Sequence, residues 1–120
     1  MAADIRHTYE ANVDLDVGAL FTTIPKLIQG ESGATVISLT CRRGSAAADI
    51  TGATCYGLVI NAANEENIIS GSVAGNVASF TLDAASGAMV GRLKVILFLQ
   101  LGGATKPIFH GMTAVVPGET

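Results

Sequence analysis

The sequence predicts an all-β fold, an immunoglobulin-like antiparallel β-sandwich of about seven strands. Two observations lead to this prediction. Short segments that alternate apolar and polar residues are separated by Gly, Asn, Asp and Ser roughly every ten residues, as is typical of sandwiches. Aromatic residues make up only 5% of the chain and Trp is absent, so the core must consist of small and β-branched side chains, which suit packed sheets.

Length and composition indicate one domain that folds by itself. The chain has 120 residues, of which 49% are hydrophobic and 14% charged, a composition far from that of disordered segments. We predict an N-terminal arm over residues 1–8, the immunoglobulin-like sandwich over 9–116 and a C-terminal tail over 117–120. The low charge density leaves apolar surface uncovered, which favours a chain that works inside an assembly.

The first half of the chain begins with three predicted strand segments. Alternation is clearest from Tyr9 to Val17, where apolar side chains occupy the odd positions and polar ones the even positions. The segment around Pro25 fits an edge strand or a strand start, because proline lacks a backbone donor. After a turn over 29–33, the strand Thr35–Arg42 directs Cys41 to the same inner face as its apolar neighbours.

In the next predicted strand, Thr54–Ile60, the larger side chains of Tyr56 and Leu58 define the core face. This parity places Cys55 on the opposite face. Since Cys41 points inward, the two thiols are expected to lie on different sides of the sheet, where no disulfide can form. We therefore expect two reduced, free cysteines, as is usual in proteins made inside the cell.

The second half continues the strand pattern. Its segments are a polar turn over 61–67, a strand over 68–73, a tight turn at Gly75-Asn76, a strand over 77–82, a connection within 81–90 with at most one helical turn, and a last strand over 106–116. The strongest strand, 91–101, turns its odd-numbered residues from Leu93 to Leu101 inward. Its outer face carries Ile96 and Phe98, which are covered either by another part of the same chain or by a partner.

Charge and hydropathy exclude several classes of partner. The net charge is −3 and the seven Lys and Arg are scattered, which argues against nucleic acid; Arg42 and Arg43 are best explained as a strand end before the turn at Gly44. Residues 1–7 lack the basic start and apolar stretch of a secretory signal, so we expect synthesis in the cytoplasm. The apolar stretch Val95–Leu99 is too short for a membrane span.

The sequence offers little catalytic or metal-binding chemistry. His7 and His110 lie far apart in the chain, one in the arm and one in the last strand, so we predict no catalytic site and no enzyme. No paired Cys or His spacing suggests a metal site, and no glycine-rich loop suggests a cofactor. Asp14 and Asp16 could bind a hard cation together with Asp4 or Glu10, but they are explained more simply as a solvent face.

Several short motifs follow one another in an order that extends over nearly the whole chain. They are Val13-Asp14-Leu15, Ile28-Gln29-Gly30-Glu31, Asp49-Ile50-Thr51-Gly52-Ala53-Thr54, Gly75-Asn76-Val77, Phe80-Thr81-Leu82 and Val90-Gly91-Arg92-Leu93-Lys94-Val95. Their order and spacing resemble the N-terminal immunoglobulin-like domain of phage upper-baseplate proteins of the BppU type. The chain departs from that pattern in three places. The loop after Asn61 lacks an Asp-Gly turn, residues 43–48 are rich in alanine, and the sequence stops where many relatives continue.

This resemblance implies a structural or adaptor role in a phage or prophage tail baseplate, where the domain scaffolds the attachment of receptor-binding proteins. It also implies a homo-oligomer, for which we expect a trimer, with other tail proteins as partners and the virion tail as location. Either the chain is a short family member or it is the N-terminal domain alone. The alternative function is a sandwich that binds carbohydrate or a host receptor, although the aromatic side chains that stack on sugars are few. Ile96 and Phe98 are the candidate interface residues.

Overall fold

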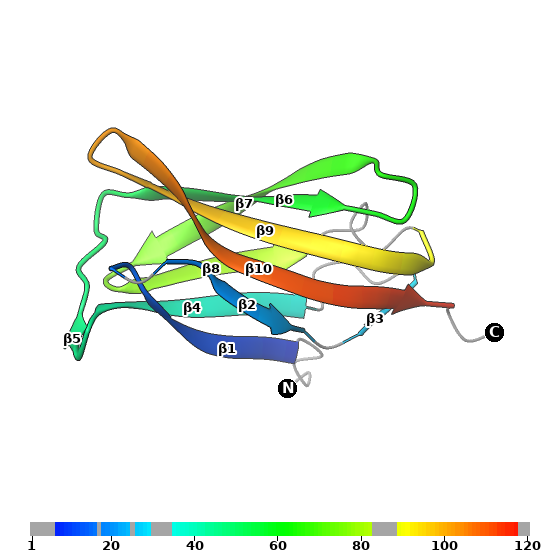
Figure 1. Ribbon diagram of the computed structural model, residues 1–120, viewed down its shortest axis with the longest axis horizontal. Coiled ribbons are helices and arrows are strands. Elements are labelled where there is room, and N and C mark those ends of the chain that lie inside the picture. Colours follow the sequence, from blue (N-terminus) through cyan, green and yellow to red (C-terminus); the bar gives the residue numbers. More distant parts are fainter. Residues whose placement is uncertain (1–6, 17, 25, 30–34, 83–88, 118–120) are drawn as a thin grey trace, which may run out of the picture.

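The computed structural model describes residues 7–16, 18–24, 26–29, 35–82 and 89–117, and within these ranges it confirms an all-β fold without helices (Figure 1). The strands are β1 (His7–Asp14), β2 (Leu20–Thr23), β3 (Leu27–Ile28), β4 (Thr35–Arg43), β5 (Ala46–Ala47), β6 (Thr54–Ile60), β7 (Glu66–Ala74), β8 (Val77–Leu82), β9 (Gly91–Leu101) and β10 (Ala104–Val116). The prediction of about seven strands was too low, because β2, β3 and β5 are short additions to the longer strands.

The strands form one mixed sheet that is nearly barrel-shaped. Its order is β1-β4-β8-β7-β6-β9-β10-β2, with β3 paired to β10 and β5 to β4. The prediction of a purely antiparallel fold is wrong, because β1 runs parallel to β4, and β2 and β3 run parallel to β10. The immunoglobulin-like sandwich stays a prediction, since the structure shows only the coarser all-β arrangement.

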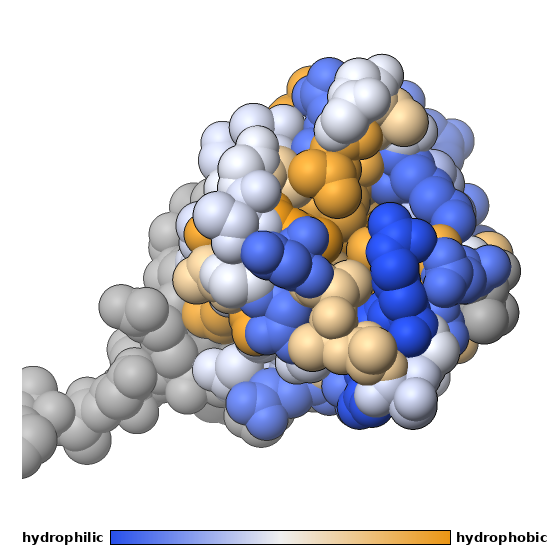
Figure 2. Space-filling view, turned by 90° about the vertical axis from the view of Figure 1, so that its left-hand side faces the viewer, coloured by the Kyte–Doolittle hydropathy of each residue, from blue (hydrophilic) through white to orange (hydrophobic). Residues whose placement is uncertain are grey.

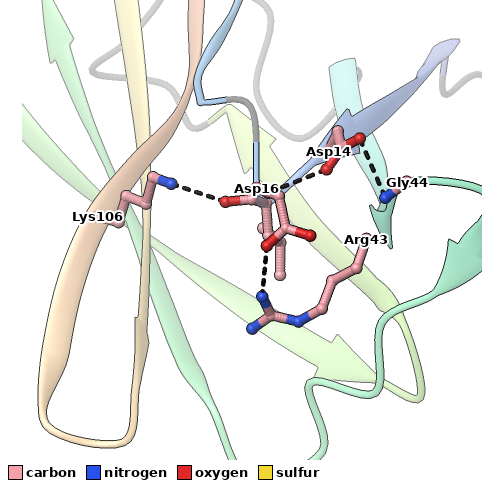
Figure 3. A network of polar contacts seen from close by, with 6 residues as sticks. Asp14, Asp16, Arg43, Gly44 and Lys106 are labelled. Atoms are coloured by element: carbon pink, nitrogen blue, oxygen red, sulfur yellow. Dashed lines mark hydrogen bonds and ion pairs between the residues drawn. The ribbon is translucent and has the colours of Figure 1, made fainter.

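The two end strands of the sheet approach each other through side chains. The hydroxyl of Tyr9 on β1 donates to Oγ1 of Thr22 on β2 at 3.4 Å, and its ring lies edge-on to Phe109 with centroids 6.2 Å apart. Nearer the hairpin between β9 and β10, Nζ of Lys106 donates to the backbone oxygen of Leu15 at 2.7 Å (Figure 3). The contacts of Tyr9 with Phe109 and of Leu15 with Lys106 join the first and last parts of the described chain.

The core lies between the inner sides of these strands. Its buried apolar side chains are Val13, Leu15, Ile24, Leu27, Ile37, Leu39, Cys41, Ala48, Ile50, Cys55, Val59, Ile69, Ala78, Phe80, Leu82, Leu93, Val95, Leu97, Leu99, Ile108, Phe109 and Val115. The inward parity predicted for β1, β4, β8 and β9 is therefore confirmed, Cys41 included. Leu101 is an exception: it is 36% exposed, because β9 ends there at the Gly102-Gly103 turn.

Strand β6 has the opposite parity from the one predicted. Cys55, Gly57 and Val59 face the core, whereas Tyr56 and Leu58 face outward and are half-buried. The reason is the crowding of the inner side. A Cβ placed on Gly57 would lie 2.7 Å from side-chain atoms of both Ile69 and Leu97, so only a residue without a side chain fits there.

Both cysteines are thus buried and free, which corrects the outward placement of Cys55 and agrees with the expectation that they form no disulfide. The argument that opposite faces keep them apart was wrong, because both thiols lie in the core cluster. Burial raises the pKa of the Cys41 thiol. Burial also raises the pKa of Cys55, with a smaller contribution from the neighbouring Cys41.

Turn positions agree well with the sequence. Gly102 and Gly103 have φ of 63° and 82°, which fits a two-residue hairpin in which both central residues are left-handed. Gly75 has φ of 64° in the tight turn between β7 and β8. Val17, Pro25, most of the 29–33 turn and residues 83–88 of the 81–90 connection lie outside the described residues.

The predicted boundaries of the sandwich are not tested. Strand β1 already begins at His7, within the segment predicted as an arm, and β10 ends at Val116.

Candidate protein-binding face

One outer surface of the sheet is rich in apolar and aromatic side chains. It covers the outer side of β6, β9, β10 and β2 and the first half of β7, and we call it the aromatic face. Its members are Phe21, Tyr56, Leu58, Ile68, Ile96, Phe98, His110 and Met112. The strand registers bring these residues together, because each of the strands contributes alternate positions to the same side.

The centre of the aromatic face is a single row across five strands. Register pairs Ile68 with Leu58, Leu58 with Ile96, Ile96 with His110 and His110 with Phe21. The two ends of this row are the most accessible, with Ile68 69% and Phe21 72% exposed. Because large apolar side chains gain free energy when water is removed from them, this row has the chemistry of a contact surface.

Two ring pairs give the aromatic face a defined shape. Tyr56 on β6 stacks on Phe98 on β9, with centroids 5.0 Å apart and planes inclined by 16°. Phe21 on β2 stacks on His110 on β10 at 4.5 Å and 11°. Stacked rings hold each other in place, so part of the entropy cost of ordering them at an interface is already met.

Only two residues in the middle of the aromatic face were predicted from the sequence. Ile96 and Phe98 lie there on β9 as predicted, half-buried by their neighbours, and no observation tests them as an interface. Tyr56 and Leu58 were missed because the larger side chains of β6 were assigned to the core. Phe21 was missed because only tertiary pairing brings β2 beside β10.

Two open hollows lie on the β2 side of the aromatic face. The first has a volume of about 430 Å³ and is lined by Phe21, Thr22, Thr23, Lys94, His110, Gly111 and Met112. The second, of about 500 Å³, is lined by Thr23, Ile24, Lys26, Gly91, Arg92, Met112, Thr113 and Ala114. Both are mainly apolar, and the 46% exposed side chain of Met112 borders both of them.

The opposite outer surface is polar, and we call it the hydroxyl face. It covers the outer side of β1, β4 and β8 and the second half of β7. Its members are Glu10, Asn12, Val36, Ser38, Thr40, Ser72, Ser79 and Thr81. One row, Glu10–Ser38–Ser79–Ser72, crosses it in the same way as the apolar row crosses the aromatic face.

The two predicted acidic residues form a structural network at one end of the molecule (Figure 3). Asp14 accepts from the backbone nitrogens of Asp16 and Gly44, at 2.9 and 3.1 Å. Asp16 forms an ion pair with Arg43 at 2.8 Å. The described residues contain no group of three or more His, Cys, Asp or Glu that could hold a metal ion, and Asp4 lies outside them.

Apolar side chains gather in the middle of that same end of the molecule, surrounded by polar side chains (Figure 2). The network therefore fastens the end of the sheet. It offers no arrangement of acid, base and nucleophile.

His110 lies in β10 as predicted, stacked on Phe21, and His7 is the first residue of β1. The backbone thus places the two histidines on strands at opposite ends of the described chain. The ranges that the structure describes contain no helical segment with the length and hydropathy of a membrane span.

Comparison with known proteins gives a likeness of fold. The chain is similar to the N-terminal domain of phage TP901-1 ORF48, with 16% sequence identity and a TM-score of 0.50. The match covers 94% of this chain and 100% of that domain. No protein-family model and no curated protein sequence matches the chain. At this level of identity the likeness shows a shared fold.

Proposed function

We propose that this chain is a structural or adaptor domain of a phage or prophage tail baseplate, which binds another protein through its aromatic face. The aromatic face is the observation that carries the proposal, because a row of four large apolar side chains and His110 spans five strands with its apolar ends exposed. The fold shared with the N-terminal domain of a phage protein supports the proposed setting. So does the resemblance of the sequence motifs to phage upper-baseplate proteins.

The chemistry of the aromatic face suits a protein partner. The centres of protein interfaces are depleted in charge and enriched in aromatic residues and Met, and the strongest contacts cluster near the middle. The stacked Tyr56 and Phe98 occupy such a position, beside Ile96. We propose a homo-oligomer, a trimer by resemblance, whose baseplate neighbours include the receptor-binding proteins that the domain helps to attach.

Replacing Phe98 by Ala tests this proposal. The half-buried ring contributes modestly to folding, but its loss from the middle of an interface should weaken association at least tenfold. Size-exclusion chromatography with light scattering measures the mass over a range of protein concentrations. The matched control is Ser38→Ala on the hydroxyl face, which should leave association unchanged. A concentration-independent monomer for both the original chain and the Phe98 variant contradicts the proposal.

The same proposal includes location and chemistry. The chain is made in the host cytoplasm and becomes part of the virion tail, and it acts by binding, without catalysis, metal or cofactor. Five of the described groups of this kind have structural surroundings: both cysteines are buried, Asp14 and Asp16 hold a turn, and His110 stacks on a ring.

Phe21 favours a second candidate function, binding of a carbohydrate or other host receptor. Its ring is largely exposed, stacks on His110 and borders the hollow of about 430 Å³. An aromatic ring held in this way can stack on the apolar face of a sugar. A glycan array tests it: reproducible hits that disappear in Phe21→Ala support this function, and an array without hits contradicts it.

A further inference from the structure

A third hollow adjoins the aromatic face where β6 and β9 meet the loop between β6 and β7. It has a volume of about 430 Å³ and is lined by Ile60, Asn61, Ala62, Asn64, Arg92 and Lys94. Arg92 and Lys94 are alternate, exposed residues on the outer side of β9. Neither side chain forms a hydrogen bond or ion pair with any residue that the structure describes. Two cations with unused donors therefore share one hollow.

Hydrogen bonds and close packing hold the loop between β6 and β7, which forms one wall of this hollow. The Asn61 side chain accepts from the backbone nitrogens of Ala63 and Glu65 at 2.9 and 3.0 Å, and donates to Oε1 of Glu65 at 3.0 Å. A Cβ on Gly91, whose φ is +129°, would lie 2.8 Å from Cβ of Ala62. The glycine thus allows the loop to pack directly against the start of β9, beside Arg92.

We infer that this hollow binds a carboxylate of an acidic segment in the protein that docks on the aromatic face; the inference rests on the proposed function. Charged hydrogen bonds from a guanidinium and an ammonium group to a carboxylate are stronger than neutral ones. Lys94 also borders the hollow lined by Phe21 and His110. A segment with an acidic residue beside an apolar one matches both hollows at once.

A carboxylate fits this hollow better than a polyanion does. Register places Ile60 between Lys94 on one side and the exposed Glu66 on the other, so an anion that extends over β6 meets negative charge. Binding to nucleic acid uses a broad group of cations, whereas this rim has Arg92 and Lys94, with Lys26 at the next hollow. The chain as a whole carries a net charge of −3.

Three capped pentapeptides, added to the full chain, test the inference. In each peptide leucine alternates with one other residue, which is glutamate in the first, glutamine in the second and lysine in the third. Backbone amide resonances followed by NMR report where each peptide binds. The glutamate peptide should shift Asn61, Arg92 and Lys94, and its affinity should fall as salt is added. In the double variant Arg92→Gln/Lys94→Gln its affinity should drop about tenfold or more.

The matched control is Arg42→Gln/Arg43→Gln, which removes two cations from another part of the surface and should leave the affinity unchanged. Equal binding of the glutamate and glutamine peptides overturns the carboxylate site but leaves the apolar docking face intact. Absence of any binding overturns it too, even if Phe98→Ala weakens association. If Phe98→Ala has no effect while the glutamate peptide still binds at Arg92 and Lys94, the proposed function fails and the carboxylate site stands.

Discussion

The aromatic face and the hydroxyl face are built by the same strand alternation and differ only in the side chains that the outer positions carry. On the hydroxyl face, the row Glu10–Ser38–Ser79–Ser72 presents groups that water satisfies. On the aromatic face, the corresponding row, from Ile68 through Ile96 to Phe21, presents four large apolar side chains, which form no hydrogen bonds with water, and the imidazole of His110. Only the second surface gains free energy from being covered.

Strand β7 joins the two surfaces. Its first half pairs with β6 and its second half with β8, so Ile68 lies on the aromatic face and Ser72 on the hydroxyl face. Both residues lie on the outer side of one strand, four positions apart. The chemistry of the surface therefore changes within a single strand, so the apolar row is limited to one side of the molecule.

The largest expected effect tests which side chains of β6 belong to the aromatic face. Gly57→Val should lower the free energy of unfolding by about 1–3 kcal/mol, because the new side chain overlaps Ile69 and Leu97. Urea denaturation measures the change. Ser70→Val, on the outer side of β7 opposite Tyr56, is the control and should stay within about 0.5 kcal/mol. A well-tolerated Gly57→Val would mean that Tyr56 and Leu58 face the core after all.

A smaller effect compares the two faces directly through double-mutant cycles. Tyr56→Ala and Phe98→Ala should show a coupling of about 0.5–1.5 kcal/mol, because their rings stack. Ser38 and Ser79 are also directly opposite each other, without a hydrogen bond between their described side chains, and should couple by only about 0.2 kcal/mol. Urea denaturation at concentrations where the protein is monomeric separates folding from association. Equal couplings would remove the contrast between the faces.

The reactivity of the two thiols tests whether Cys55 lies on the inner side of β6. Because Cys41 and Cys55 are both buried, a thiol-specific chromogenic reagent should label neither in the folded protein and both in urea. Rapid labelling of Cys55 alone would place it on the outer surface, as the sequence first suggested. The control is Cys55→Ser, in which one thiol should be labelled after unfolding.

The smallest effect is a loss of stability at alkaline pH. Burial raises the pKa of both thiols in the folded state, so their contribution is fully present below the unfolded pKa of about 8.5 and is lost as the pH rises through the folded pKa values. Melting temperatures measured at increasing pH should fall more for the original chain than for Cys41→Ala/Cys55→Ala. Parallel curves for the two proteins would contradict this expectation.

Much of the fold could be predicted from local pattern. The alternation in β1, β4, β8 and β9, the buried Phe80 and Leu82, and the turns at Gly75 and Gly102 all follow from period-two hydrophobicity and from glycine at left-handed positions. Each of these features depends on residues that are close together in the sequence, so the sequence alone can predict it. Parallel pairing of β1 with β4, and of β2 with β10, joins segments with no local signal of their partner.

The candidate site was predictable only in part, for the same reason. Ile96 and Phe98 were identified because β9 alternates strongly, with apolar residues on both sides. Side-chain size could not show which side of β6 faces the core. The core beside β6 is crowded by Ile69 and Leu97, so the smaller residue, Gly57, lies on the inner side. The pairing of Arg92 and Lys94 with the Asn61 loop required the loop to pack on Gly91.

By itself, the sequence determined an all-β chain without the spacing of a catalytic or metal motif, because alternation acts locally. The expected core of small and β-branched side chains was wrong in part, since the buried core of the described residues also contains seven Leu and two Phe. The tertiary structure decided which outer residues meet in one row, how the ends of the sheet approach each other and where both thiols lie. These features depend on register and on space in the core, and a one-residue shift of register reverses every side chain of a strand.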